Sequence, residues 1–465
     1  MQLCVVQALA LAFALLIPTA ATAAPQLTAI KRAVADAEAR GVRTGVAICD
    51  ARGKVYYRHR ATEVFTPASN MKLLTAAGVL QGLGDQFQFR TVFRIEAGVL
   101  LVEASGDPNW LQGTKHDPKS IFRRVARALH ARDRTRIRGV QLVTGSFGGP
   151  SRPPTWPKDQ YYAYYCAPTG GFVLQQGVFL MSIQQSGASK ASVQLVAPEA
   201  GYPIEGSIAE VSAKKGAVYG AIDRGDAIRV RGKFYKRSPR VEIKTSMNDP
   251  EKWYRDTLIH HLQGAGIRID PRAPDNGAAL IYEHRSGVAP ALRRMLEDSS
   301  NFAAEQCLRV LGQQTLDDGS FKGGCLALRG QLVDLVGRVP ETLKIVDGSG
   351  LSKENRITPG LVLVTMFKGF GGESGSLLRN ALAVGGETGT LSKRFRGTDL
   401  VGRVRAKTGW IRGASSLSGL VEMPSGGVRW FSILMNYDRG RGGLNKDLKR
   451  IQERIVAGVD GLDPK

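Results

Sequence analysis

The sequence predicts an α+β protein whose helix-containing ends flank a long, β-rich middle. Apolar residues recur at helical spacing near residues 71–80, 292–311 and 444–459, and pairs of strand-like runs joined by turns occur at 44–59 and 417–435. From about residue 90 to residue 280, short β-like runs alternate instead with Gly, Pro and basic turns. We therefore expect one or two small β-rich modules inserted into a domain of mixed helices and strands.

The composition is that of a globular protein with a strongly basic surface. Hydrophobic residues make up 43% of the 465 residues and charged residues 23%, which argues against disorder. A net charge of +23 is compatible with nucleic-acid binding. Because the N-terminus indicates export, we expect no nucleic acid but attraction to a polyanionic envelope, either cell-wall polymer or an acidic membrane surface. A solvated basic surface without any partner is the alternative.

Residues 1–24 have the pattern of a secretory signal peptide. An apolar run reaches Ile17, Pro18 interrupts it, and Ala21-Thr22-Ala23 offers a small-residue cleavage site, although no Lys or Arg precedes the run. A membrane anchor is the alternative, but the run is shorter than the about 18–20 apolar residues that a span needs. We expect an exported protein of the periplasm or cell envelope, associated with membranes at most peripherally.

Four cysteines follow the predicted signal, and an even number in an oxidising compartment permits disulfides. Cys307 and Cys325 are close in sequence and are the pair we expect. Cys49 lies in an apolar strand and should be a buried free thiol. The histidines form no HExxH motif, and the neighbouring side chains of His260-His261 point in different directions on a helix. We therefore expect neither a metal site nor a cofactor.

Local patterns predict the elements of the first half in order. Thr44–Cys49 and Val55–His59 flank a turn and form a β-hairpin. Pro67 suits a helix entry and Gly82 a helix stop, so Ser69 should lie at the N-terminal end of the helix between them. The strands expected further along are Thr91–Ile95, Val99–Glu103, Val140–Thr144, Val193–Val196, Ile228–Val230 and Val241–Ile243.

In the second half we expect helices at Trp253–Leu262 and Leu292–Leu311, and a second hairpin of Leu417–Glu422 and Val428–Met435. Strand packing is preferred to a ligand surface as the explanation for four clustered tyrosines, Tyr161, Tyr162, Tyr164 and Tyr165. Packing on a sheet is preferred to membrane-surface anchoring as the explanation for the apolar face of the last helix, made of Leu444, Leu448, Ile451, Ile455 and Val459.

The pattern S-x-x-K occurs twice and could pair a serine nucleophile with a base. No G-x-S-x-G motif occurs, which disfavours an α/β-hydrolase. Ser69 and Lys72 open an apolar helix, where this spacing places both side chains on one face and the helix N-terminus suits a developing oxyanion. Ser212 and Lys215 lie in a polar stretch and should form a surface turn. The first copy is therefore the candidate nucleophile and base.

Two further motifs could complete such a site. A lysine acts as a base only if its pKa falls, which burial and a second nearby cation can achieve. Lys407-Thr408-Gly409 can supply that cation beside the C-terminal hairpin, hold a carboxylate and leave room for a substrate backbone. S-x-N occurs at Ser299/Asn301, directly before a helix, and at Ser246/Asn248, which we interpret as a turn or helix cap. Each motif alone has a structural explanation as a cap or a surface charge.

Taken together, Ser69-Asn70-Met71-Lys72, Ser299-Ser300-Asn301 and Lys407-Thr408-Gly409 resemble the penicillin-recognising serine transferases. More narrowly, the chain resembles the class C D-alanyl-D-alanine carboxypeptidase/endopeptidase family over nearly its whole length after the signal. The segments that carry this narrower resemblance are Thr66–Leu74, 105–108, 347–352 with Asn355-Arg356, 389–391 and 404–419.

The resemblance implies a β-lactamase/penicillin-binding transpeptidase-like catalytic domain, with helices against a five-stranded antiparallel sheet. Residues 25–95 and 280–465 would form it, and residues 96–279 would be an inserted second domain with a nested third domain near 197–242. It also implies an acyl-enzyme peptidase that acts on peptidoglycan stem peptides, is covalently inhibited by β-lactams and uses no cofactor.

The resemblance also implies a role for each residue of the motifs. Ser69 would attack the carbonyl between two D-alanines and Lys72 would take its proton. Ser299 would relay a proton to the leaving amine, and Asn301 would position the substrate amide. The remaining groups would be Lys407 and Thr408 on the terminal carboxylate, Gly409 beside the substrate backbone, and the backbone N–H groups of Ser69 and Trp410 as the oxyanion hole.

Two positions depart from the family pattern. Ser300 replaces a frequent Asp, and its side chain should point away from the reaction. Trp410 replaces a small hydroxyl residue, and its bulk at the rim could alter the choice of substrate or antibiotic. A β-lactamase or esterase with the same chemistry and a cell-wall-binding protein without activity are the alternatives.

Overall fold

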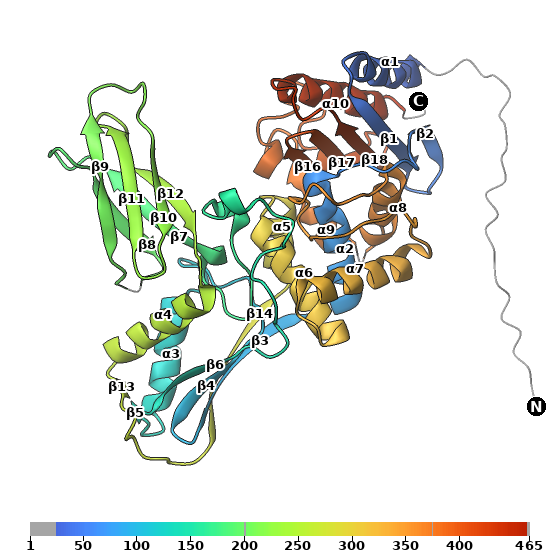
Figure 1. The fold of residues 1–465 in the computed structure, drawn as a ribbon. Coiled ribbons are helices and arrows are strands. Elements are labelled where there is room, and N and C mark those ends of the chain that lie inside the picture. Colours follow the sequence, from blue (N-terminus) through green and yellow to red (C-terminus); the bar gives the residue numbers. More distant parts are fainter. Residues whose placement is uncertain (1–24, 200, 374, 463–465) are drawn as a thin grey trace, which may run out of the picture.

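The computed structural model describes residues 25–199, 201–373 and 375–462. The predicted signal peptide lies outside the described residues. Helices and strands from the two ends of the chain form one domain, and the middle of the chain projects from it as two further β-rich parts (Figure 1).

The first domain is built on a six-stranded antiparallel sheet that joins both ends of the chain. Its order is β15-β16-β17-β18-β1-β2, so the N-terminal hairpin completes a sheet made otherwise by the last strands. The two-residue β15 is the sixth strand, one more than the resemblance implied. The strands are β1 (Arg43–Asp50), β2 (Val55–His59), β15 (Ala383–Val384), β16 (Val404–Ile411), β17 (Ala414–Glu422) and β18 (Val428–Asn436).

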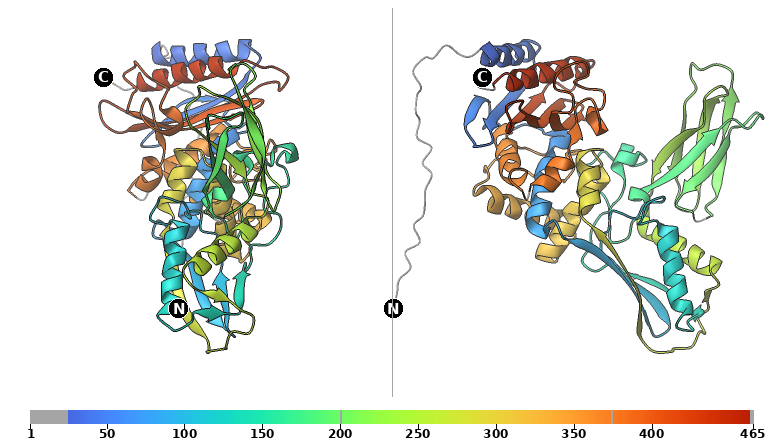
Figure 2. Two further views of the ribbon diagram at one scale, coloured as in Figure 1. Left: turned by 90° about the vertical axis from the view of Figure 1, so that its left-hand side faces the viewer. Right: turned by 180° about the vertical axis from the view of Figure 1, so that it is seen from behind.

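Helices cover both faces of this sheet. On one face, α1 (Pro25–Ala39) and α10 (Asn445–Asp460) lie side by side (Figure 2) and share an apolar core with the strands. The apolar face of α10 therefore packs on protein, as expected. The helices on the other face are α2 (Met71–Leu83), α5 (Ala289–Leu296), α6 (Asn301–Leu316), α7 (Phe321–Val336) and α8 (Pro359–Gly369), with the short α9 (Ser376–Asn380) nearby.

The helix expected at Leu292–Leu311 is instead two helices, α5 and α6. Ser299 between them has a φ of +62°, a left-handed conformation that no α-helix contains. Ser300 then caps α6, because its side-chain oxygen accepts a hydrogen bond from the backbone N–H of Ala303 at 3.2 Å. This break turns the segment before α6 into a loop.

The second part of the fold is a four-stranded sheet in the order β14-β3-β4-β6, packed against two helices. Its elements are β3 (Gln88–Glu96), β4 (Val99–Glu103), β6 (Gly139–Val143), β14 (Ala279–Gly287), α3 (Pro118–His130) and α4 (Pro250–Gly264), with the small pair β5 (Arg136–Ile137) and β13 (Arg268–Ile269).

The third part consists of two three-stranded sheets that share one apolar core. They are β7 (Val178–Gln184), β8 (Ser192–Ala197) and β12 (Val241–Ser246), and β9 (Ile204–Val211), β10 (Tyr219–Asp223) and β11 (Ile228–Tyr235). We propose domain limits that follow the sheets, near residues 88 and 287 for the insertion and near 178 and 246 for the nested module. These ranges are wider than 96–279 and 197–242.

The four clustered tyrosines do not pack as a strand. Residues 158–160 and 164–166 form short 3₁₀ turns, and Tyr164 and Tyr165 line a cleft. An isolated bridge from Ala163 to Thr245 is too short to continue a sheet. The explanation preferred from the sequence was therefore wrong.

The expected disulfide between Cys307 and Cys325 is also absent, and all four described cysteines are free thiols. The two side chains lie near different charged groups: Cys307 near Arg294, and Cys325 near Glu305. Proximity in sequence therefore did not bring the sulfurs together. Cys49 is buried and free, as predicted.

Over the three described ranges, no helix combines the length and the apolar character needed to span a bilayer. Within those same ranges, His, Cys, Asp and Glu side chains do not gather into a group of three or more that could bind a metal ion.

We predict that both Cys307 and Cys325 remain reduced. Burial raises the pKa of Cys307 to about 12, so its thiol should resist alkylation at pH 8 in the native protein. When the protein is unfolded in guanidinium without reductant and treated with an alkylating reagent, mass spectrometry should find both cysteines alkylated, because neither is tied up in a disulfide. A peptide pair linked through these two residues would contradict the structure.

Candidate active site

The helix α2 is apolar on all sides and buried from Met71 to Val79, which carries Lys72 into the interior. The half-buried Ser69 lies in the 3₁₀ turn Ala68–Asn70 that leads into this helix. Gly350 packs against that turn, because a Cβ at this position would lie 1.8 Å from the carbonyl oxygen of Ala68. The nucleophile candidate is therefore held at a crowded helix entry.

Lys72 contacts Ser69 directly, with 3.0 Å between Nζ and Oγ. Its amine also donates to Oδ1 of Asn301 at 2.7 Å and to the carbonyl oxygen of Ser349 at 2.8 Å. A neutral amine has two N–H bonds, so these two acceptors leave its lone pair facing Ser69. Burial lowers the pKa of Lys72 to about 7, while the negative charges of Glu305 and Asp347 oppose this effect.

Lys407 is the second buried cation of the site. It donates to Oγ of Ser299 and to the backbone carbonyl of Thr408, both at 2.8 Å. Burial, and then the charge of Lys72, hold the pKa of Lys407 well below its usual range. The structure thus brings the two lysines close enough to interact, although burial is the largest cause of the lowered pKa at each.

The Ser299–Asn301 segment faces the two lysines. Asn301 uses both ends of its amide, because Nδ2 donates to the backbone carbonyl of Tyr165 at 2.9 Å while Oδ1 accepts from Lys72. The hydroxyl of Ser300 donates to Oε1 of Gln176 at 2.8 Å, and both residues line the same cleft as Ser69.

Gly409 allows β16 to approach the nucleophile. A Cβ there would lie 2.9 Å from the backbone nitrogen of Ser69 and 2.1 Å from Oγ of Ser416. Asn70, which lies in the same turn as Ser69, also holds this turn against β16, because its Nδ2 donates to the backbone carbonyl of Lys407 at 2.8 Å. The short β15 pairs β16 only at Ala406 and Arg405, so it does not cover the stretch from Thr408 onward. Trp410 stands at this rim and is 55% exposed.

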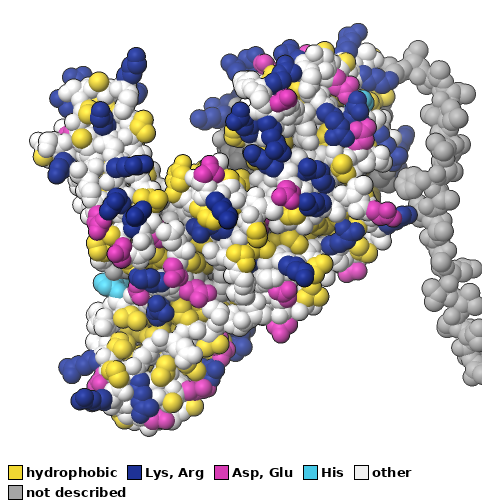
Figure 3. Space-filling model, viewed as in Figure 1, with side chains coloured by type: hydrophobic (Ala, Val, Ile, Leu, Met, Phe, Trp, Pro, Cys, Tyr) yellow, Lys and Arg dark blue, Asp and Glu magenta, His cyan; other side chains and the backbone are white. Residues whose placement is uncertain are grey.

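These groups open into a cleft of about 1260 Å³. On the viewed face the molecule is notched between the nested module and the first domain, and Lys and Arg side chains lie on both sides of the notch (Figure 3). The lining residues include Ser69, Gln160, Tyr164, Tyr165, Lys244, Asp298, Ser299, Asn301, Lys353, Arg356, Trp410, Arg412 and Arg439.

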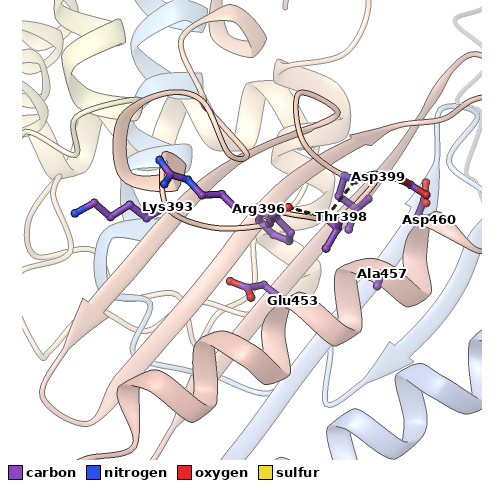
Figure 4. Close-up of a pocket in the computed structure, with 9 residues that line it drawn as sticks. Lys393, Arg396, Thr398, Asp399, Glu453, Ala457 and Asp460 are labelled. Atoms are coloured by element: carbon purple, nitrogen blue, oxygen red, sulfur yellow. Dashed lines mark hydrogen bonds between the residues drawn. The ribbon is translucent and has the colours of Figure 1, made fainter.

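A second hollow of about 360 Å³ lies between the 393–400 loop and α10 (Figure 4). Two of the carboxylates that line it have cationic partners, since Asp460 pairs with Arg403 at 2.8 Å and Glu453 with Arg394 at 2.6 Å. It lies apart from Ser69 and Lys72, so the chemistry belongs to the larger cleft.

The remaining motif copies lie elsewhere. Ser212 and Lys215 are exposed beside the end of β9, as the surface-turn interpretation predicted. Ser246 accepts from the Arg152 guanidinium at 2.8 Å, and Asn248 donates to the backbone of Asp223 at 2.8 Å. Asp249 then caps α4.

Sequence reasoning missed three contributors to the site: Tyr165, Glu305 and the backbone of Ser349. Glu305 follows Asn301 by four residues on α6, a spacing that places both side chains on one helix face. A carboxylate within an apolar helix was the sequence signal by which Glu305 could have been found. Tyr165 and Ser349 contribute backbone carbonyls, which the identity of a side chain does not reveal.

The chain is similar to known proteins over most of its length. A model of the D-Ala-D-Ala carboxypeptidase 3 (S13) family matches residues 26–457. A D-alanyl-D-alanine carboxypeptidase of Actinomadura sp. (strain R39) is 28% identical over 442 residues, covering 87% of this chain and 80% of the relative. The D-alanyl-D-alanine carboxypeptidase DacB of Haemophilus influenzae is 24% identical, covering 80% and 81% respectively.

Solved structures show the same fold. Penicillin binding protein 4 (dacB) from Haemophilus influenzae superposes with a TM-score of 0.75 and 21% identity, covering 91% of this chain and 98% of that one. The same protein complexed with a novel β-lactam gives a TM-score of 0.72 at 20% identity, covering 92% and 99%. With a family model that spans nearly all described residues and a matching fold, the chain belongs to the D-Ala-D-Ala carboxypeptidase 3 (S13) family of serine peptidases.

Proposed function

We propose that this protein cleaves D-alanyl-D-alanine in peptidoglycan stem peptides through an acyl-enzyme on Ser69. The observation that carries the proposal is the buried Lys72 amine, 3.0 Å from Oγ of Ser69, with its other two contacts fixed by carbonyl oxygens. A serine needs such an adjacent base to attack an acyl carbon.

The reaction then follows from the geometry. Oγ of Ser69 attacks the carbonyl carbon between the two D-alanines while Nζ of Lys72 takes the hydroxyl proton. The C–N bond breaks, and the leaving amine receives a proton through Ser299, which contacts Lys407 at 2.8 Å. Water attacks the resulting ester, releases the shortened peptide and restores Ser69. The backbone N–H groups of Ser69 and Trp410 stabilise the oxyanion.

Substrate binding uses the edge of β16. The side-chain amine of Lys407 and the hydroxyl of Thr408 hold the terminal carboxylate, and Gly409 lies beside the substrate backbone. The missing Cβ of Gly409 lets β16 pack against the turn that carries Ser69. Asn301 positions the substrate amide with the lone pair of Oδ1 that Lys72 does not use. The volume of the cleft, about 1260 Å³, supports endopeptidase action on cross-linked peptides as well as carboxypeptidase action on linear ones.

The expected location is the periplasm or cell envelope. The signal-like residues 1–24 support export, and the net charge of +23 supports attraction to anionic envelope polymers and at most a peripheral contact with membranes. β-Lactams act as covalent inhibitors, because a strained cyclic amide can acylate the same serine. The solved relative bound to a β-lactam supports this point.

We predict that Ser69→Ala abolishes covalent labelling by a fluorescent penicillin. The second S-x-x-K sequence, Ser212–Lys215, offers a matched control. The Ser212→Ala variant alters an exposed serine with the same spacing to a lysine and should leave labelling unchanged. Gel fluorescence measures both. Labelling that persists in Ser69→Ala would refute the assignment of the nucleophile.

We predict that acylation of Ser69 rises with pH and levels off above an apparent pKa near 7. Lys72 accepts a proton only as the neutral amine, and burial lowers its pKa to about 7, so the ammonium and the inactive form dominate at lower pH. Stopped-flow acylation with a chromogenic β-lactam gives the profile. Lys72→Arg keeps a permanent charge and should slow acylation about 10²–10⁴-fold, the range of a lost general base. An unchanged rate in that variant would exclude Lys72 as the base.

We predict that incubation with purified muropeptides releases D-alanine from pentapeptides and also splits cross-linked dimers. Mass spectrometry of both reaction mixtures measures the two activities. Ser69→Ala serves as the blank, and intact substrates in the presence of the wild-type protein would refute the proposed function.

A further inference from the structure

We propose that Glu305 is a positioning residue that holds the Gly348–Ser349 backbone so that Lys72 directs its lone pair at Ser69. The proposal rests on the proposed function of Ser69 and Lys72 and assigns a role to a carboxylate outside the three motifs. Glu305 itself does not contact the nucleophile in any recorded hydrogen bond.

The carboxylate of Glu305 is fully buried and uses both oxygens on one loop. Oε2 accepts from the backbone N–H of Gly348 and Oε1 from that of Ser349, both at 2.8 Å. These donors fix the backbone of two successive residues. Together with the nearby hydroxyl of Ser349 they also lower the pKa of the Glu305 carboxyl, but burial outweighs them and raises it to about 8.

The carbonyl groups of those same two residues face α2. The carbonyl of Gly348 accepts from Oγ1 of Thr75 at 2.7 Å, and that of Ser349 accepts from Nζ of Lys72 at 2.8 Å. The loop therefore lies between Glu305 on α6 and the two polar side chains of α2. A shift of the loop would move the acceptor that orients the catalytic amine.

Asn301 and Glu305 together define the orientation of Lys72. Asn301 provides one acceptor directly, and Glu305, one helical turn later, fixes the second acceptor through Ser349. With both N–H bonds of the neutral amine directed by α6, the remaining tetrahedral direction points to Oγ of Ser69. Residues of α6 thus determine two of the three contacts of the Lys72 amine, those with Asn301 and with Ser349.

The charge of Glu305 also acts on Lys72. Burial raises the pKa of Glu305 to about 8, against its hydrogen bonds, and its negative charge raises the pKa of Lys72. The other charged groups around the base are Asp347 on the same loop, which raises the pKa of Lys72, and Lys407 on β16, which Lys72 repels. Because Glu305 and Lys72 interact, they titrate as a coupled pair.

Glu305→Gln tests the proposal. The amide keeps the shape and one acceptor but sets an NH₂ group against a backbone N–H, so the loop loses a contact. We expect acylation by a chromogenic β-lactam to slow about 10- to 100-fold, as misplaced catalytic groups do. We also expect the acid limb of the pH profile to stay in place, because a carboxyl whose pKa is raised to about 8 is mostly neutral where Lys72 titrates. The β-lactam concentration that half-saturates acylation should also stay unchanged, because Glu305 is buried and does not line the cleft.

Two further variants separate the effects. Thr75→Val removes a contact to the same loop without changing charge, so it should slow acylation about tenfold and leave the acid limb in place. Glu251→Gln removes a half-buried carboxylate from α4, in the second part of the fold, and should change neither quantity. Thermal unfolding followed by circular dichroism checks the folding of each variant.

The outcomes are decisive. A folded Glu305→Gln variant with the wild-type rate, or with a slower rate that comes only from weaker binding of the β-lactam, overturns the proposal. If that variant does not fold, a wild-type rate in Thr75→Val overturns it instead. Failure of the wild-type protein to acylate at all would contradict the proposed function rather than the role of Glu305.

Discussion

The structure depends on an amine that is buried without a carboxylate in contact. Lys72 is fully buried, and its recorded contacts are a serine hydroxyl, a side-chain amide oxygen and a backbone carbonyl. Placing an ammonium in such surroundings is costly, so the neutral form gains and the amine becomes a base near neutral pH. An ion pair with a carboxylate would have preserved the charge and removed the reactivity.

The surrounding elements serve this arrangement. The α2 helix is apolar all round, which gives Lys72 its low-dielectric environment. The loop of residues 347–352 is itself held by a buried carboxylate, because Asp347 accepts from the backbone of Gly350 and Ser352 and from the side chains of Asn355 and Trp156. Trp156 belongs to the insertion, so the insertion helps to fix the loop that contacts Lys72.

The sequence was sufficient to predict the parts of the site that depend on local patterns. Helical periodicity after Ser69 separated it from Ser212, and the C-terminal hairpin placed Lys407 beside a strand edge. The S-x-N motif predicted the helix start after Ser299. The apolar spacing of 292–311 continues across this position, however, and did not reveal the single left-handed residue that separates α5 from α6. The disulfide was mispredicted because sequence separation does not say which way two helical side chains face. Glu305 could not be assigned, because its partners lie 43 and 44 residues away in backbone groups.

The strand order has a consequence for when the site can form during synthesis of the chain. Asn70 is bonded to the backbone of Lys407, 337 residues later, and β1 is paired with β18 along its full length. A nascent chain that already contains Ser69 and Lys72 therefore lacks the strands that enclose them until the ribosome has passed residue 436. The site around the nucleophile can therefore form only after the last hairpin, β17 and β18, has joined β1 in the sheet.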